Sequence, residues 1–148
     1  MSRTVSPSPE KSSGVGSGVL VAVITGVAVG VGGKAFVEMI IGVSAGSIML
    51  AKQWIDWPDE NNEASAELFP CMNIAPVICD THGEEDEWNE LHSLVHLTEG
   101  DQIGYGIPSG GAMRISPDGV VEAISMPLFR IEQRGGKIAR INDLAATN

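Results

Sequence analysis

The fold of this chain is decided by VLVAVITGVAVGVGGKAFVEMIIGVSAGSIMLAKQWIDW, residues 19–57. Between Lys11 and Lys34 there are 22 consecutive residues without a charge, which is long enough to cross a membrane. Valine and glycine take the place of the leucine that membrane spans usually contain. We expect this stretch to bury itself in a membrane or against further copies of the chain.

Two periodicities coexist in the uncharged stretch. Small residues recur every four positions, and on a helix they would form a stripe against which a second helix packs closely. Valines on alternate positions instead predict a strand with one β-branched face. We favour the helix, because a long apolar strand would need partners on both edges. The residues predicted to pack in an oligomer or a membrane are Gly14, Gly18, Ala22, Gly26, Gly30, Gly42 and Gly46.

Residues 35–55 have apolar side chains at spacings of three and four, which predicts a second helix. Trp54 and Trp57 are placed where an aromatic belt at a membrane interface would end a span, and Pro58 stops the helix. The expected structure is a hairpin of two apolar helices, or one span preceded by an apolar arm. A buried core hairpin of a soluble oligomer is the alternative.

Composition divides the chain into four parts. Residues 1–18 are a Ser/Pro/Gly-rich flexible tail, residues 19–57 are the apolar Gly/Val-rich segment, residues 58–67 are an acidic linker, and residues 68–148 form an acidic β-rich domain. In the last part we expect a helix over 81–97 and then short strands separated by Gly/Pro turns. The fold class is therefore α+β, with a small antiparallel β domain that carries one helix.

Charge is distributed unevenly along the chain. The net charge is −10 overall, yet residues 1–57 carry four basic and three acidic side chains, a net of +1. Residues 58–148 carry five basic against sixteen acidic side chains, a net of −11. An acidic surface of this kind repels phosphate backbones, so nucleic acid is excluded as an expected partner.

Cysteines and histidines cluster between residues 71 and 96. Cys79 and His82 have C-x-x-H spacing, and His92 and His96 are four residues apart, which would place both imidazoles on one face of a helix. These four residues are the candidate ligands for zinc. The alternative is that the histidines lie on the surface of an acidic helix and the cysteines pack as small apolar groups; in that case the chain has no cofactor.

Motifs for catalysis are missing from the sequence. There is no G-x-S-x-G, no phosphate-binding loop and no nucleophile with an evident base. Glycines 104 and 106 lack the strand-to-helix context of a nucleotide loop. The sequence therefore predicts no catalytic residue and a protein that is not an enzyme.

The order of features over residues 17–107 resembles the early region of tailed-bacteriophage tail-tip and hub proteins. It consists of a Gly-rich apolar stretch, the segment Ala75-Pro76-Val77-Ile78, and then GEEDEWNELHSLVHLTEGDQIGYG at 83–106. The resemblance implies a structural virion component near the tail tip, where apolar segments meet the host membrane. It implies no catalytic residues.

The expected function is that of a non-enzymatic structural or assembly protein, located in a virion or at a membrane. It would associate with copies of itself and with other structural proteins through its Gly-rich N-terminal segment. Two alternatives stay open, a membrane-anchored subunit of a bacterial envelope complex and a small metal-binding domain.

Overall fold

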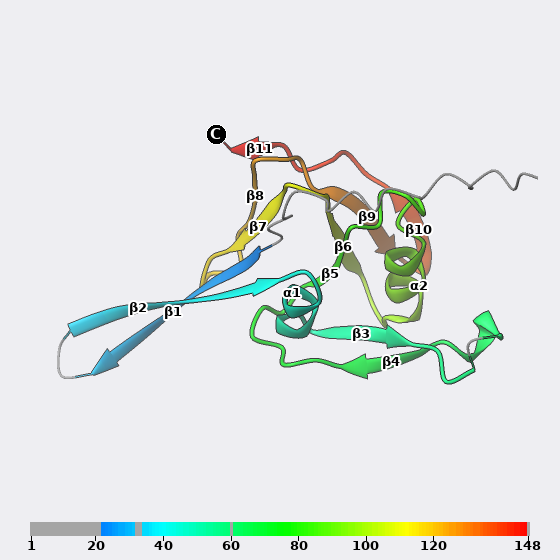
Figure 1. Cartoon of the computed structure of the whole chain (residues 1–148), viewed down its shortest axis with the longest axis horizontal. Coiled ribbons are helices and arrows are strands. Elements are labelled where there is room, and N and C mark those ends of the chain that lie inside the picture. Colours follow the sequence, from blue (N-terminus) through cyan, green and yellow to red (C-terminus); the bar gives the residue numbers. More distant parts are fainter. Residues whose placement is uncertain (1–21, 32–33, 60, 148) are drawn as a thin grey trace, which may run out of the picture.

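The computed structural model describes residues 22–31, 34–59 and 61–147, which form three sheets with two α-helices packed among them (Figure 1). The first sheet has the strand order β11-β8-β7-β1-β2. Its strands are β1 (Ala22–Val31), β2 (Lys34–Val43), β7 (Ala112–Ile115), β8 (Val121–Ile124) and β11 (Ala146–Thr147). The mixed α+β class expected from the sequence is confirmed.

The other two sheets are a four-stranded sheet and a two-stranded ribbon. The four-stranded sheet has the order β10-β9-β6-β5 and consists of β5 (Ile78–Thr81), β6 (Gln102–Ile107), β9 (Phe129–Arg134) and β10 (Lys137–Arg140). The ribbon pairs β3 (Gln53–Asp56) with β4 (Glu67–Pro70). The helices are α1 (Ala45–Leu50), α2 (Asn89–Leu97) and the single 3-10 turn Glu63–Ser65.

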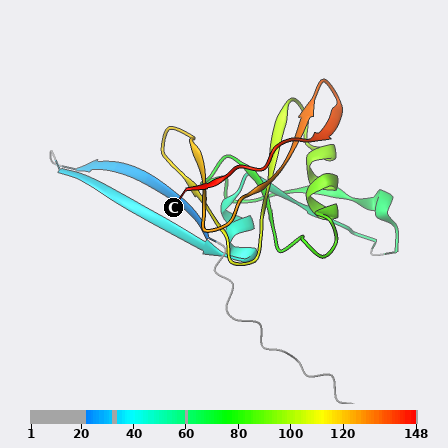
Figure 2. The same ribbon diagram turned by 90° about the horizontal axis from the view of Figure 1, so that it is seen from above.

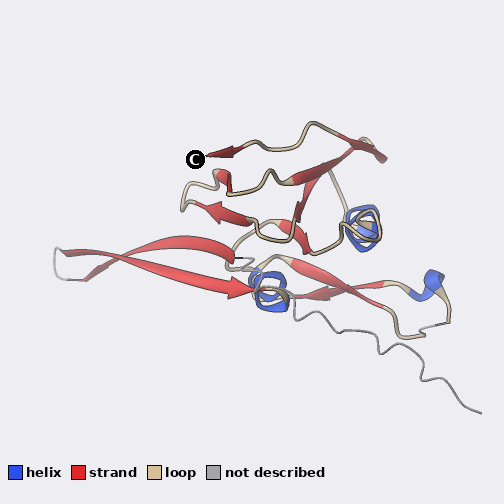
Figure 3. Cartoon of the chain, turned by 45° about the horizontal axis from the view of Figure 1, so that its top comes forward, coloured by secondary structure: helices blue, strands red, loops and turns tan. Residues whose placement is uncertain are grey.

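Both larger sheets are mixed, so the prediction of a purely antiparallel sheet is wrong. The pairs β5–β6, β1–β7 and β8–β11 run parallel, while the other pairs run antiparallel. Parallel neighbours need a long connection, and α2 provides it between β5 and β6. Figure 3 shows this connection as the helix that stands beside the sheet.

The N-terminal segment forms an antiparallel ribbon of two long strands, β1 and β2, here called the arm. Its register runs from Ala22 opposite Val43 to Val31 opposite Lys34. The other described elements are here called the body. Only Val23–Thr25 pair with β7, so the rest of the arm extends away from the body (Figures 1 and 2). Both segments of the arm are strands in the structure, and β2 and β7 supply edge partners of the kind that an apolar strand needs.

Residues 35–57 change structure twice instead of forming the predicted helix. Strand β2 is followed by the six-residue helix α1 and then by β3. Ser44 takes a left-handed backbone conformation with φ of 51° between β2 and α1. The Ser47 hydroxyl donates a hydrogen bond of 2.8 Å to the Gly42 carbonyl, which folds α1 back onto the end of β2. A continuous helix is incompatible with this reversal.

Two apolar cores hold the body together. One consists of Leu50, Ala51, Ala75, Cys79, Ile107, Met113, Ile115, Ala123 and Leu128. The other consists of Ile55, Ile78, Trp88, Leu91, Leu94, Val95 and Ile131. Residues from 19–57 and from 68–148 contribute to both cores. The two parts that composition separated therefore pack together, with Leu50 and Ala51 in one core and Ile55 in the other.

Helix α2 begins later than predicted. The helix was expected to start at residue 81, but Thr81 is the last residue of β5 and residues 82–88 form a loop. The helix runs only from Asn89 to Leu97. Leu91, Leu94 and Val95 are buried, as the amphipathic pattern requires. In the part of the chain that the structure describes, no helix has the length and apolar character needed to cross a membrane.

Candidate functional site

An open pocket of about 610 Å³ lies where the loop after β5 meets the end of β10 and the residues that follow it. Glu84 and Glu87 come from the loop, and Arg140 and Asp143 come from the end of β10 and the segment beyond it. Pro108, Met126 and Pro127 form an apolar wall. The pocket thus combines an acidic rim with an apolar side.

Three aromatic rings form the floor of the pocket. The rings of Trp88 and Phe129 stack with centroids 5.3 Å apart and planes 16° apart, and His92 meets Phe129 edge-on at 6.2 Å. The Arg140 guanidinium carbon lies 4.6 Å above the Phe129 ring centroid. The same guanidinium donates two hydrogen bonds to the Asp143 carboxylate, at 3.1 and 3.2 Å. One largely exposed cation that lines the pocket is therefore held by a ring and a carboxylate together.

The loop after β5 owes its shape to three residues in the left-handed region. His82, Glu87 and Trp88 have φ angles of 64°, 58° and 62°, which are unusual for side chains of this size. Backbone hydrogen bonds hold them, from the His82 N–H to the Ile107 carbonyl at 3.2 Å and from the Trp88 N–H to the Gly83 carbonyl at 2.7 Å. The loop therefore curls back on itself and presents Glu84 and Glu87 at the pocket rim.

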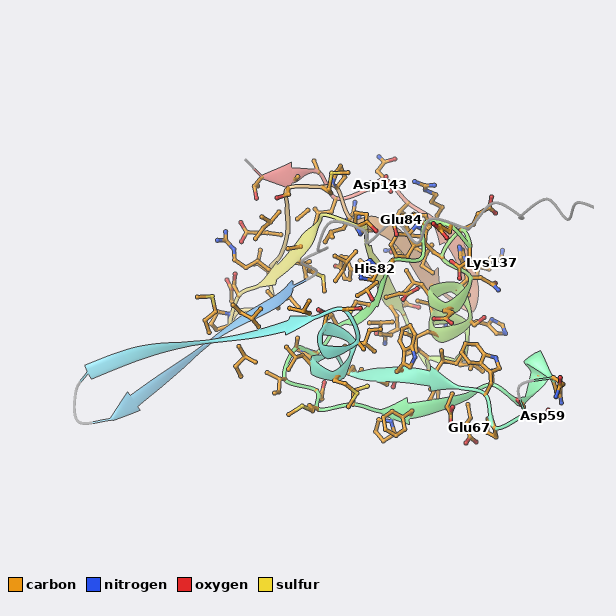
Figure 4. All side chains as sticks on the ribbon, viewed as in Figure 1. Asp59, Glu67, His82, Glu84, Lys137 and Asp143 are labelled. Carbon is orange, nitrogen blue, oxygen red and sulfur yellow. The ribbon has the colours of Figure 1, made fainter. Side chains whose placement is uncertain are left out.

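A serine and a histidine meet beside the pocket. The His82 Nδ1 lies 3.3 Å from the Ser109 hydroxyl, and the Ser109 backbone N–H donates a hydrogen bond to the Glu84 carboxylate. Figure 4 shows Glu84 between His82 and Asp143 in that view, and both carboxylates line the pocket. Because Glu84 contacts the serine backbone and not the imidazole, the arrangement ties two loops together and is not a catalytic triad.

Asp80 is buried under the same loop. A Cβ placed on Gly83 would lie 3.1 Å from the Asp80 carboxylate and 2.6 Å from the Trp88 ring. The carboxylate and the indole therefore both pack closely against Gly83. Burial raises the pKa of Asp80 from its ordinary value of 3.8 to about 7, although a hydrogen bond from the Thr81 N–H opposes the shift. Glu90, Asp86 and Glu84 raise this pKa further by repulsion.

The candidate zinc ligands lie in different surroundings. Cys79 is fully buried, and burial is the main reason that its pKa rises to about 12, which opposes the thiolate that zinc requires. His82 contacts Ser109, His92 contacts Phe129, and His96 is exposed. Among residues 22–31, 34–59 and 61–147, no three His, Cys, Asp or Glu side chains gather in a group that could hold a metal.

The residues predicted to pack in an oligomer fall on the arm and on α1. Gly14 and Gly18 lie outside the described residues, whereas Ala22, Gly26 and Gly30 are positions in β1. Gly42 faces the backbone of Gly46 within the same chain, where a Cβ would clash with it, while Gly46 has open space around it. A close approach at Gly42 is thus used inside the chain.

The tryptophans predicted for a membrane interface pack against the protein itself. Trp54 in β3 and Trp57 just beyond it are partly buried against the core around Leu91, Leu94 and Ile131. Gly104 and Gly106 serve packing as well, because a Cβ on either would press on α2 or on Trp88.

Comparison with protein-family models, curated proteins and solved structures finds no match to this chain.

The sequence indicated only half of the pocket. Glu84, Glu87 and His92 fall in the acidic helical segment that the sequence singled out, whereas Phe129, Arg140 and Asp143 do not. These last three residues follow no recognisable motif. They reach the pocket because β9 pairs with β6 and β10 pairs with β9, and spacing along the chain does not reveal the pairing of β6 with β9.

Proposed function

We propose that this chain is a non-enzymatic assembly protein that associates with copies of itself through the arm, β1 and β2. The observation that carries the proposal is a row of large apolar side chains on β2 that face solvent. Met39, Ile41 and Val43 are 61%, 55% and 46% exposed, whereas the intervening Ile40 packs against a core. Exposed apolar surface of this kind marks an interaction site in a folded protein.

The register of the arm places small residues beside this apolar row. Gly26 is opposite Met39, and Ala22 is opposite Val43, so these positions share one face of the ribbon. Gly30, opposite Ala35, continues the same face toward the tip. Ile24, opposite Ile41, interrupts the small residues of β1 on this face. A second ribbon stacked on it can approach closely at Gly26 and bury Met39, Ile41 and Val43.

The free edge of β2 offers a second means of association. β2 is the last strand of its sheet, so its outward N–H and C=O groups are open to a further strand. Lys34 and Glu38 are the only charged residues in its ten positions. Edges that proteins keep unpaired usually carry more charge or are short, so this edge is suited to receiving a strand from a second copy.

The setting that we propose is a virion near the tail tip of a tailed phage. Support for this part comes from the resemblance over residues 17–107 alone. Copies of this chain and other structural proteins would be its partners. A helical hairpin over residues 19–57 would present the same small residues for association. Circular dichroism of a peptide spanning residues 12–45 in detergent separates the two forms, and a β spectrum is expected.

Self-association is tested with two substitutions at equal exposure. Met39 and Met72 are each 61% exposed, but only Met39 belongs to the arm. Met39→Lys should raise the protein concentration for half-assembly by about tenfold in sedimentation equilibrium, the effect of removing a central interface contact. Met72→Lys should leave it unchanged. A chain that is monomeric at all accessible concentrations, or equal effects of both lysines, contradicts the proposal.

A further inference from the structure

We propose that the pocket between the loop after β5 and the end of β10 binds a basic side chain, lysine or arginine, presented by a different protein. The inference goes beyond self-association, because the pocket lies on the body and the arm takes no part in it. It is carried by the combination of an aromatic floor, an apolar wall and a carboxylate rim in one cavity of about 610 Å³.

The wall suits the stem of such a side chain. Lysine and arginine carry three or four methylene groups before the charge, and these groups prefer apolar surface. Pro108, Met126 and Pro127 provide that surface, and Met126 is 43% exposed, so it is available for contact. An incoming stem can lie along this wall without burying any polar group.

The rim suits the charge at the end of the stem. Four charged side chains line the cavity, and Arg140 is already paired with Asp143. Glu84 and Glu87 also line the cavity, and both are exposed. The Glu84 carboxylate accepts one backbone N–H from Ser109, which fixes its position. Two carboxylates beside an apolar wall would pair with one incoming cation.

The chain itself demonstrates this chemistry in the same cavity. The Arg140 guanidinium rests 4.6 Å from the centroid of Phe129 and is held from the side by Asp143. A ring with a carboxylate beside it therefore already accommodates one cation. Glu84 and Glu87 line the same cavity, together with the partly exposed rings of Phe129 and His92. A strongly acidic chain, with a net charge of −10, also attracts basic partners as they approach.

Binding is tested by titrating the full-length protein, labelled with ¹⁵N, with Nα-acetyl-lysine methylamide. Chemical shifts of Glu87, Trp88 and His92 should move with the added ligand, and 0.5 M salt should weaken the effect by screening. The norleucine analogue has the same stem without the charge and should bind at least about threefold more weakly, a difference typical of one exposed charge pair. Equal binding of the two compounds would overturn the proposal.

Two variants locate the site. Glu87→Gln should weaken lysine binding about two- to fivefold, the usual effect of losing one exposed ion pair. Glu85→Gln is the matched control, because Glu85 lies in the same loop and is exposed but does not line the pocket. An equal loss in both variants would show general attraction to an acidic loop and overturn the assignment. Lys34 of the arm is itself a basic side chain that a second copy could place in the pocket. Tighter lysine binding in Lys34→Gln would show this competition. It would overturn the proposal that a different protein supplies the basic side chain, but it would leave self-association intact.

Discussion

Gly106 of β6 lies directly against the indole of Trp88, so that a Cβ at position 106 would come within 2.6 Å of the ring. This contact explains why the pocket exists where it does. Trp88 has a left-handed backbone, and its side chain can fold over the sheet only because Gly106 leaves room for it. The stacked Phe129 ring and the loop that carries Glu84 and Glu87 depend on the same placement.

The first prediction concerns this contact. Gly106→Ala should destabilise the protein by about 1–3 kcal/mol, because an added methyl group in a packed site forces the ring or the strand to move. Gly46→Ala is the control, since Gly46 lies in α1 with nothing within 4 Å of an added Cβ. There alanine should be neutral or stabilising by about 0.5–1 kcal/mol. Urea unfolding measures both, and equal effects would refute the packing argument.

The second prediction concerns pH. Asp80 has an ordinary pKa of 3.8 and a pKa of about 7 in the fold, chiefly because it is buried. The folded state therefore binds more protons than the unfolded state between about pH 4 and pH 7, and the free energy of unfolding falls as pH rises through that range. Above pH 7 the free energy of unfolding has lost this whole contribution, which is at most about 4 kcal/mol at 1.36 kcal/mol per pKa unit.

Asp80→Asn isolates this contribution. Asparagine keeps an oxygen that can accept the hydrogen bond from the Thr81 N–H but cannot ionise. The variant should match the wild type near pH 4 and exceed it in stability at pH 8. The measurement is the urea midpoint of both proteins at the two pH values. If the difference between them does not change with pH, Asp80 does not ionise in the way that its burial implies.

The third prediction concerns the two thiols. Cys71 is partly exposed, and burial raises its pKa, whereas Cys79 is buried with a pKa of about 12. A disulfide reagent at pH 8 should therefore modify one thiol in the folded protein and both in urea. Elemental analysis of untagged protein should accompany it. Stoichiometric zinc, with Cys79 protected until a chelator is added, would contradict this expectation and support the metal site instead.

Local signals predicted the turns and short strands that follow residue 101. The turn at Ser116-Pro117-Asp118-Gly119 has the expected hydrogen bond from the Gly119 N–H to the Ser116 carbonyl, at 2.8 Å. The strands on either side of it also lie where apolar runs alternate with turns. These features depend only on neighbouring residues, so a single sequence is sufficient to predict them.

The arm could not be predicted in the same way. Small residues every four positions and valines every two are both present in residues 22–31, and neither pattern outweighs the other. Pairing of Val23–Thr25 with Met113–Ile115, far along the chain, distinguishes them in the structure. The pocket has the same origin, since Arg140 and Glu87 come together only through the sheet. Distant pairing of this kind has no local signal.

The last prediction separates the arm from the body. Replacing residues 27–38 by Asn-Gly would join Gly26 to Met39, which face each other in the register, through a two-residue hairpin turn. The pairing of Val23–Thr25 with β7 and the packing of Ile40 would be kept, so the shortened protein should fold with a thermal midpoint within about 5 °C of the wild type. It should associate less in sedimentation experiments, because the outer part of the ribbon and of the β2 edge is gone, while the exposed row Met39, Ile41 and Val43 is kept. Deleting residues 1–57 should have a different result, since Leu50, Ala51 and Ile55 would be lost from the two cores and the remainder should fail to fold. A stable fold after the larger deletion would show that the body does not need these residues. Undiminished association after the shorter one would show that residues 27–38 take no part in it, and the surface would then be confined to Met39–Val43 or lie on the body.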